Sequence, residues 1–191
     1  EDTVRGLQEI AHGYRKEFSP LVVGVTGSVG KTTTKEMIAS VLSAKYNTLK
    51  TIGNYNNEIG LPFTICNLER GHEAAVIEMG MNHFGEISRL TRVTQPDIAV
   101  ISAIGQSHIE FLGSKEGILR AKLEILEGLS PDGCAVLNGD DPMLWSLSGT
   151  LPFETIYYGV KNPAVQVFGA ARIETLDQIR FTVREIQIQS L

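Results

Sequence analysis

The sequence has few features that would tie the chain to a membrane or hold it together by covalent cross-links. Its two cysteines, Cys66 and Cys134, lie far apart in 191 residues, which argues for free core thiols and against a disulfide framework. No apolar run approaches the roughly 20 residues of a membrane-spanning helix, and the first residues do not resemble a signal peptide. We therefore expect a protein without a membrane span in a reducing cytoplasm.

Basic residues are also scarce. The chain has 17 Lys and Arg against 22 Asp and Glu, a net charge of −5, and no Lys/Arg cluster. This balance argues against nucleic acid as the main partner. The hydrophobic content of 42% with 20% charged residues is typical of one globular domain that can bury a core. We expect a monomer.

Short apolar runs alternate with helical patterns over the first 150 residues. Candidate strands are 21–25, 48–51, 74–78, 98–104 and 134–137. Candidate helices are 3–16, 33–46, 57–67, 85–93, 115–129 and 141–147. This rhythm predicts an α/β fold with a mostly parallel sheet flanked by helices, in which ligands gather at the carboxyl ends of the strands.

After about residue 150 the rhythm changes. Strand patterns continue without helices between them, which predicts a small antiparallel appendage built from 156–160, 165–173 and 179–183. The alternation slips phase at Glu185-Ile186, which suggests a bulge or a broken turn there.

The stretch "VTGSVGKTTTKE", residues 25–36, joins an apolar strand to an amphipathic helix. It misses the common phosphate-loop pattern G-x-x-x-x-G-K-[ST], because Val25 stands where the first glycine belongs. Nevertheless, backbone N–H groups at such a junction converge on a spot that suits a phosphate. Lys31 is then expected against the outer phosphates, with the Thr32 hydroxyl on Mg²⁺. The alternative is an ordinary turn in which Thr32 or Thr33 only caps a helix.

Two further residues at strand ends are candidates for chemistry. Glu78 ends the run "AAVIE", where a carboxylate could hold a metal beside a phosphate loop. A solvent-exposed carboxylate at the end of a strand would give the same sequence pattern. His108 follows the strand pattern 98–104, and it could bind a metal, act as an acid or base, or simply occupy a loop.

Lys122 falls near the middle of the apolar stripe of the predicted helix 115–129. The stripe is formed by Ile118, Leu119, Ile125, Leu126 and Leu129. A lysine there is costly unless it snorkels to solvent, finds a partner or loses its charge. Both a snorkelling lysine and a functional lysine near a metal fit this pattern.

Three functional classes fit a phosphate loop. A GTPase switch would need an Asn-Lys-x-Asp motif, which does not occur. A small-metabolite kinase leaves Glu78, His108 and Lys122 without an explanation. A non-catalytic nucleotide sensor fits the motif as well as an enzyme does.

Six ordered stretches resemble the central domain of the Mur ligases: "GVTGSVGKTTTKEM", "GNYNNEIGLP", "AAVIEMG", "NHFGEI", "SHIEFLGSKEGILRAKLEIL" and "LNGDD". The resemblance covers roughly residues 5–185. This family spells its phosphate loop G-x-x-G-K-[ST], which this sequence satisfies. The first two stretches are most similar to the members that add D-Ala-D-Ala, and folylpolyglutamate synthases are the nearest alternative family. The implied domain is a P-loop ATP-binding core at 20–150, with a leading helix at 1–19 and the antiparallel part at 151–191.

The resemblance implies an ATP-dependent peptide ligase of bacterial cell-wall precursor synthesis. In this family the carboxylate of a UDP-N-acetylmuramoyl-tripeptide attacks the γ-phosphate of ATP, and the amine of D-Ala-D-Ala then displaces phosphate from the acyl phosphate. The cofactors implied are ATP and Mg²⁺. Positioning and charge neutralisation dominate such phosphoryl transfer.

The site residues follow from the same resemblance. Those implied to bind the nucleotide are Thr26, Gly27, Ser28, Val29, Gly30, Lys31, Thr32 and Thr33, with Asn57 near the γ-phosphate. Thr32 and Glu78 would hold one Mg²⁺, and His108 would hold a second together with a carbamylated Lys122. Lys31, His108 and Lys122 are the implied catalytic residues.

The family's chains also carry an N-terminal uridine-nucleotide domain and a closing C-terminal domain. The present sequence opens on what resembles the tail of the first domain. It stops before the family's H-N-x-x-N-type adenine-side motif. We therefore expect this piece to contain the central ATPase domain only.

Overall fold

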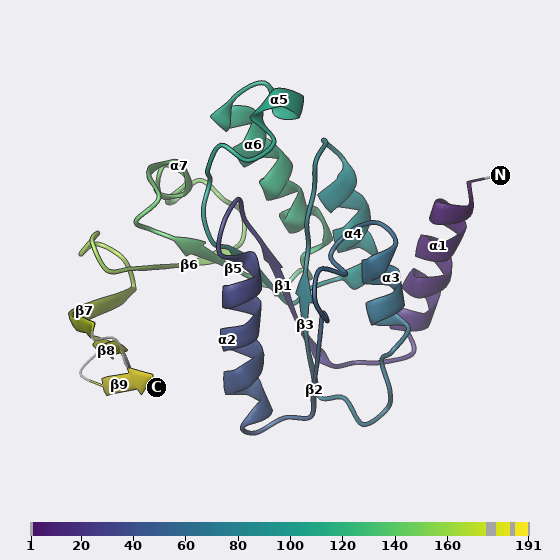
Figure 1. The fold of residues 1–191 in the computed structure, drawn as a ribbon, viewed down its shortest axis with the longest axis horizontal. Helices are drawn as coiled ribbons and strands as arrows, with labels where there is room; N and C mark the ends of the chain where they lie inside the picture. Colours follow the sequence, from purple (N-terminus) through teal and green to yellow (C-terminus); the bar gives the residue numbers. More distant parts are fainter. Residues whose placement is uncertain (1, 175–178, 184–185, 191) are drawn as a thin grey trace.

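The computed structural model describes residues 2–174, 179–183 and 186–190. Within these ranges nine strands form one sheet in the order β2-β3-β1-β4-β5-β6-β7-β8-β9 (Figure 1). The strands are β1 (Leu21–Thr26), β2 (Thr48–Lys50), β3 (Ala74–Glu78), β4 (Ile98–Ile101), β5 (Cys134–Asn138), β6 (Glu154–Gly159), β7 (Val167–Glu174), β8 (Ile179–Val183) and β9 (Ile186–Ser190).

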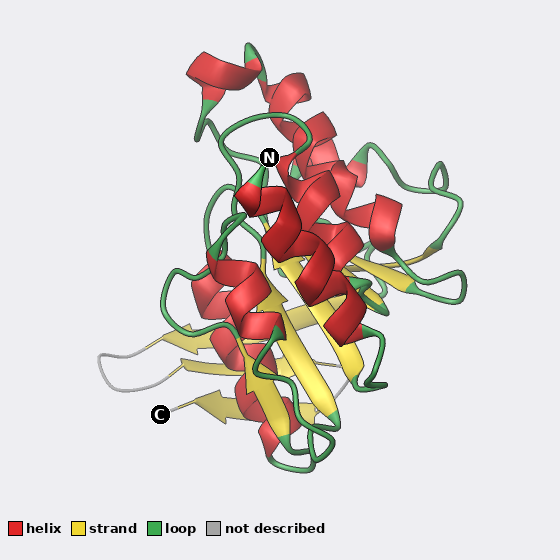
Figure 2. Ribbon diagram, turned by 90° about the vertical axis from the view of Figure 1, so that its right-hand side faces the viewer, coloured by secondary structure: helices red, strands yellow, loops and turns green. Residues whose placement is uncertain are grey.

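Helices cover both faces of the parallel part of this sheet, in front of and behind the strands (Figure 2). They are α1 (Thr3–Arg15), α2 (Lys31–Ser43), α3 (Gly60–Ile65), α4 (Glu86–Thr94), α5 (Ile109–Leu112), α6 (Lys115–Leu123), the 3₁₀ helix η1 (Glu124–Gly128) and α7 (Pro142–Trp145). No helix in the described ranges is long and apolar enough to cross a membrane.

The core has two parts because successive strand residues point to opposite faces of the sheet. On one face Val23, Val25 and Val100 pack with Ala39 of α2. On the other, Val22 belongs to the larger cluster formed with α1, α3, α4, α6 and η1. The buried β-branched strands are typical of a parallel sheet covered on both sides.

The strand order reverses beside β1. From β1 the chain moves outward to β2 and back to β3, and then crosses β1 to form β4 on its other side. Ligands of open α/β sheets bind at such a reversal, beyond the carboxyl ends of the strands. The loop that follows β1 lies at this point, and the pairing of Val25 with Glu78 puts Glu78 beside it.

The predicted α/β class with a mostly parallel sheet is confirmed, but the appendage is smaller than expected. β6 runs parallel to β5 over five residue pairs, and β7 is parallel to β6 at two pairs; only β7, β8 and β9 are antiparallel. The direction of β6 is set by the crossover through α7 that precedes it, so the predicted change at residue 150 is wrong for this strand. Glu185, where a phase slip was expected, lies outside the described residues.

Some helix bounds also differ from the predictions. The helix expected at 57–67 spans only Gly60–Ile65, and the one expected at 115–129 becomes a 3₁₀ helix from Glu124. The strand expected to reach 104 ends at Ile101, and α5 was not predicted. Asp141 caps α7 with Pro142 in its first turn, and both cysteines are free, as expected.

Candidate functional site

The loop between β1 and α2 is held in place by the two residues that follow β4. The Ser102 hydroxyl donates to the carbonyl oxygen of Val29 at 2.6 Å, and the N–H of Ser28 donates to the carbonyl of Ala103 at 2.8 Å. Gly27 has φ 151°, and a Cβ added there would lie 2.0 Å from Ser102 Oγ. Only glycine can bring the loop this close to β4.

The N-terminus of α2 carries no side-chain cap. Its N-cap is Gly30, with φ 79° and no side-chain hydrogen bond, so the alternative of a capping Thr32 or Thr33 is wrong. Both threonines are exposed in the first turn, where the free N–H groups and the helix dipole favour an anion. The ammonium of Lys31 donates to the carbonyl of Gly27 at 3.0 Å, so it already lies against the loop.

Glu78 reaches the same place from β3 and is buried, with only 1% of the residue exposed. Its Oε1 accepts a 2.7 Å hydrogen bond from Asn56 Nδ2, while its Oε2 is buried and has no partner. A buried carboxylate oxygen without a partner is costly unless a cation or donor is bound to it. Glu78 is therefore a fitting ligand for a divalent cation, and it is not the exposed carboxylate of the alternative reading.

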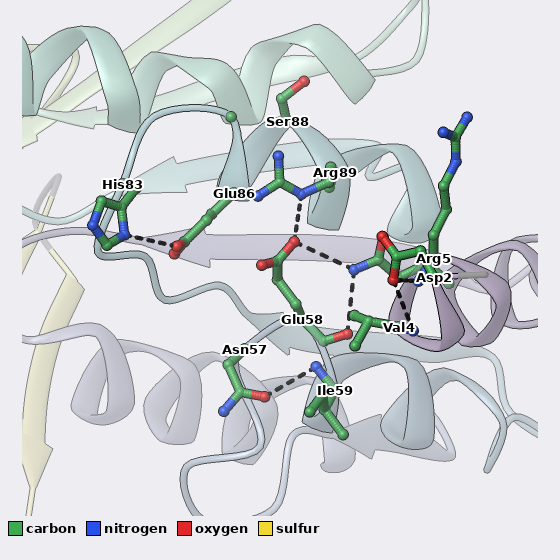
Figure 3. Close-up of polar contacts among 12 residues, drawn as sticks. Asp2, Val4, Arg5, Asn57, Glu58, Ile59, His83, Glu86, Ser88 and Arg89 are labelled. Atoms are coloured by element: carbon green, nitrogen blue, oxygen red, sulfur yellow. Dashed lines mark hydrogen bonds and ion pairs between the residues drawn. The ribbon is translucent and has the colours of Figure 1, made fainter.

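Two neighbouring asparagines behave differently. The side-chain oxygen of Asn57 accepts from the N–H groups of Ile59 at 3.1 Å and Gly60 at 2.8 Å, and Figure 3 shows it turned toward Ile59. The Asn57 side chain thus caps the turn that leads into α3 at Gly60, whereas the N-cap residue Ile59 makes no side-chain cap bond. Asn56, which the sequence did not single out, is the asparagine that contacts Glu78; in "NYNN" nothing distinguishes one asparagine from the next.

Lys122 is almost completely buried in α6, with 2% exposed, so it does not snorkel to solvent. Burial lowers its pKa from 10.5 to about 7, with a further contribution from the charge of Lys31. Among the described residues its side-chain ammonium has no hydrogen bond or ion pair. Near neutral pH a large fraction of these amines is therefore uncharged and nucleophilic.

His108 lies close enough to both lysines to sense their charge. Burial lowers its pKa, and Lys122 and Lys31 lower it further. It has the left-handed conformation, with φ 64°, at the N-cap of α5. The imidazole is thus kept neutral, the form in which histidine binds a metal.

The described ranges hold no group of three or more His, Cys, Asp or Glu that could bind a metal by itself. The structure instead brings single donors from different elements to one edge of the sheet: Thr32 from α2, Glu78 from β3, and His108 from the segment after β4. A cation here would need further ligands, such as phosphate oxygens or a carbamate on Lys122.

The fold and this edge define a P-loop nucleotide-binding domain of the open α/β class. A family model described as the Mur ligase middle domain matches residues 25–191. The chain belongs to this family.

Relatives and solved structures agree with this membership. The UDP-N-acetylmuramoyl-tripeptide–D-alanyl-D-alanine ligase of Bacillus subtilis (strain 168) is 52% identical over 144 residues, which cover 75% of this chain and 32% of that protein. The crystal structure of MurF ligase from Thermotoga maritima in complex with ADP has a TM-score of 0.87 and 34% identity over 99% of this chain and 44% of that one. The crystal structure of MurF from Acinetobacter baumannii has a TM-score of 0.89 and 31% identity, and the match covers 98% of this chain and 42% of that one. The chain thus spans about a third of the curated relative.

Proposed function

We propose that this chain is the ATP-binding part of a peptide ligase that joins D-Ala-D-Ala to a UDP-N-acetylmuramoyl-tripeptide. The observation that carries the proposal is the formed phosphate loop beside the unpaired buried oxygen of Glu78. Similarity to ligases of that name, one of them in complex with ADP, supports the choice of substrates and nucleotide.

In this proposal the loop N–H groups and Lys31 bind the nucleotide phosphates. Lys31 moves from the Gly27 carbonyl to the outer phosphates, where its charge is better compensated. Thr33 and the residues from Thr26 to Thr32 form the phosphate cradle. A contact of Asn57 with the γ-phosphate stays a prediction, because its side-chain oxygen is engaged in capping α3.

Mg²⁺ would supply charge neutralisation at the phosphates. Thr32 and Glu78 are the residues that would hold one ion, and His108 with a carbamylated Lys122 the other. The partly neutral amine of Lys122 is what carbamylation by CO₂ requires, since an ammonium has no lone pair to react. A location in the cytoplasm and a monomeric state stay predictions.

Other readings remain distinguishable by experiment. A different Mur-type ligase or a folylpolyglutamate synthase-like enzyme would bind ATP equally well but use other substrates. A non-catalytic nucleotide-binding module would bind ATP and turn over nothing. We expect residues 1–191 alone to bind nucleotide without forming the amide, since orientation of both substrates requires more of the protein.

Calorimetric titration of Mg-ATP tests the phosphate loop. Lys31→Ala is expected to weaken binding by about 1–3 kcal/mol, the scale of a charge-assisted hydrogen bond. Lys45→Ala, far from the loop in sequence and stacked on Tyr46, is the matched control. Unchanged binding by Lys31→Ala would rule out the phosphate-loop assignment.

Carbon-13 NMR in labelled bicarbonate tests the role of Lys122. The protein loaded with Mg²⁺ and nucleotide is expected to show one carbamate resonance that Lys122→Arg lacks, because a guanidinium stays charged and cannot be carbamylated. A wild-type spectrum without the resonance would leave Lys122 as a buried amine only.

A further inference from the structure

A second lysine of α2, which the site described above does not use, is completely buried. Lys35 is 0% exposed. Its ammonium donates to the carbonyl oxygen of Thr51 at 2.7 Å and forms an ion pair with Glu36 at 2.8 Å. Removing an ammonium from water costs several kcal/mol before any partner is found. An apolar side chain would avoid this desolvation cost, but it would leave the Thr51 carbonyl without the donor that Lys35 supplies.

Thr51 is hydrogen-bonded to Glu78. It follows β2 and is itself 0% exposed. Its N–H donates to the carbonyl of Val76, and its hydroxyl oxygen accepts the N–H of Glu78 at 2.9 Å. Lys35 therefore holds a residue that is itself hydrogen-bonded to the backbone of the candidate metal ligand.

The same segment controls the side chain of Glu78. Residues 51–56 run from Thr51 to Asn56, whose amide donates to Glu78 Oε1 and whose carbonyl accepts the N–H of Gly80 at 2.8 Å. The Glu78 carboxylate is thus fixed at one oxygen, and Oε2 is left without a partner. A displacement of Thr51 would move both contacts that orient Glu78.

We propose that Lys35 is a positioning residue for the metal side of the site. It ties the helix that carries Lys31 and Thr32 to the Thr51–Asn56 segment, and through Thr51 it holds Glu78 at a fixed place relative to the phosphate loop. This inference rests on the proposed function. It predicts that Lys35 supports the Mg²⁺-dependent part of nucleotide binding and leaves the metal-free part unchanged.

The experiment measures ATP affinity by calorimetry with Mg²⁺ and with EDTA, for wild type and Lys35→Met. Loss of a group that orients a metal ligand typically costs 10–100-fold in metal affinity. We define the ratio as the dissociation constant in EDTA divided by the dissociation constant in Mg²⁺. This ratio is expected to fall about 10-fold or more in Lys35→Met, because binding in Mg²⁺ weakens while the dissociation constant in EDTA stays within about twofold of wild type. Lys50→Met is the matched control, because the Lys50 ammonium pairs with the same Glu36, whereas the bond to the Thr51 carbonyl comes from Lys35; its ratio is expected to match wild type.

A second pair of variants tests the link from its other end. Thr51→Val removes the hydroxyl that accepts the Glu78 N–H and keeps the carbonyl that accepts from Lys35, whereas Thr51→Ser keeps both. Thr51→Val is expected to lower the ratio as Lys35→Met does, and Thr51→Ser to preserve it. Mn²⁺ binding in the presence of ATP, measured by electron paramagnetic resonance, should weaken in Lys35→Met and in Thr51→Val.

The outcomes separate this inference from the proposed function. A wild-type chain that does not bind ATP would overturn the proposed function, and this inference with it. Metal-dependent binding in wild type with an unchanged ratio in folded Lys35→Met, or equal weakening with and without metal, would overturn the role of Lys35 alone. Should Lys35→Met fail to fold by circular dichroism, Thr51→Val against Thr51→Ser decides.

Discussion

Two lysines of this domain, Lys35 and Lys122, are buried to nearly the same extent, 0% and 2% exposed, but their surroundings differ. Lys35 has a carbonyl and a carboxylate as partners. The ammonium of Lys122 has neither among the described residues, and the charge of Lys31 lowers its pKa further. Burial alone therefore does not define the chemistry of a lysine. A paired ammonium can serve as a structural tie, whereas an unpaired amine is left reactive.

The largest effect is expected for Lys122→Met. Between its pKa of about 7 in the folded state and its ordinary value of 10.5, Lys122 is neutral when folded and protonated when unfolded. Because the unfolded state then binds the extra proton, the free energy of unfolding of wild type rises with pH across this window, by up to about 1.4 kcal/mol per unit. Lys122→Met removes the free-energy cost of burying a charged ammonium. The variant should therefore be more stable than wild type by roughly 2–5 kcal/mol at pH 6.

Urea unfolding at pH 6 and pH 9.5, in buffer free of CO₂ and nucleotide, measures this effect. The advantage of Lys122→Met is expected to shrink at the higher pH. An advantage that is equal at both pH values would contradict the lowered pKa and remove one half of the comparison.

Lys35→Met should have the opposite sign at neutral pH. The Thr51 carbonyl loses its buried donor, which costs about 1–3 kcal/mol, while Glu36 stays partly exposed to water. Thermal unfolding of Lys35→Met beside Lys50→Met measures the difference. A stabilised Lys35→Met would show that the two lysines are equivalent.

The smallest effect concerns Asn56 and Asn57, which extend the comparison to the segment that Lys35 holds. Asn57→Ala removes the cap of α3 and should cost about 1 kcal/mol of stability with Mg²⁺-dependent ATP binding retained. Asn56→Ala should weaken that binding and leave the α3 cap intact. Denaturation and calorimetry on both variants would contradict these assignments if the two effects were exchanged.

The sequence predicts the part of this architecture that local patterns encode. The β–α rhythm, the glycine-lysine-threonine junction and the helical position of Lys122 each depend on neighbouring residues, and each is confirmed. The parallel direction of β6 was missed because it depends on the crossover through α7. The end of the strand at Ile101 was missed because the hydrogen bonds of Ser102 with Val29 and Asn138 join residues far apart in the chain.

The contacts that orient the site were harder to predict because they join residues far apart in the chain. Ser102 reaches Val29, Asn56 reaches Glu78, and Lys35 reaches Thr51. None of these pairs has a spacing that sets it apart from ordinary polar residues in a loop. Lys122 could be recognised from the sequence as an unusual residue, because a charged side chain inside an apolar stripe contradicts the pattern around it.

The hydrogen bonds from Ser102 and Ser28 give the phosphate loop its shape before any ligand arrives. A ligand that enters such a loop loses little affinity to the ordering of backbone, and the main rearrangement left is the release of Lys31 from Gly27. The strength of nucleotide binding is then set partly by Ser102, a serine behind the loop. Selection could therefore tune affinity at this position without altering any group that touches the phosphates.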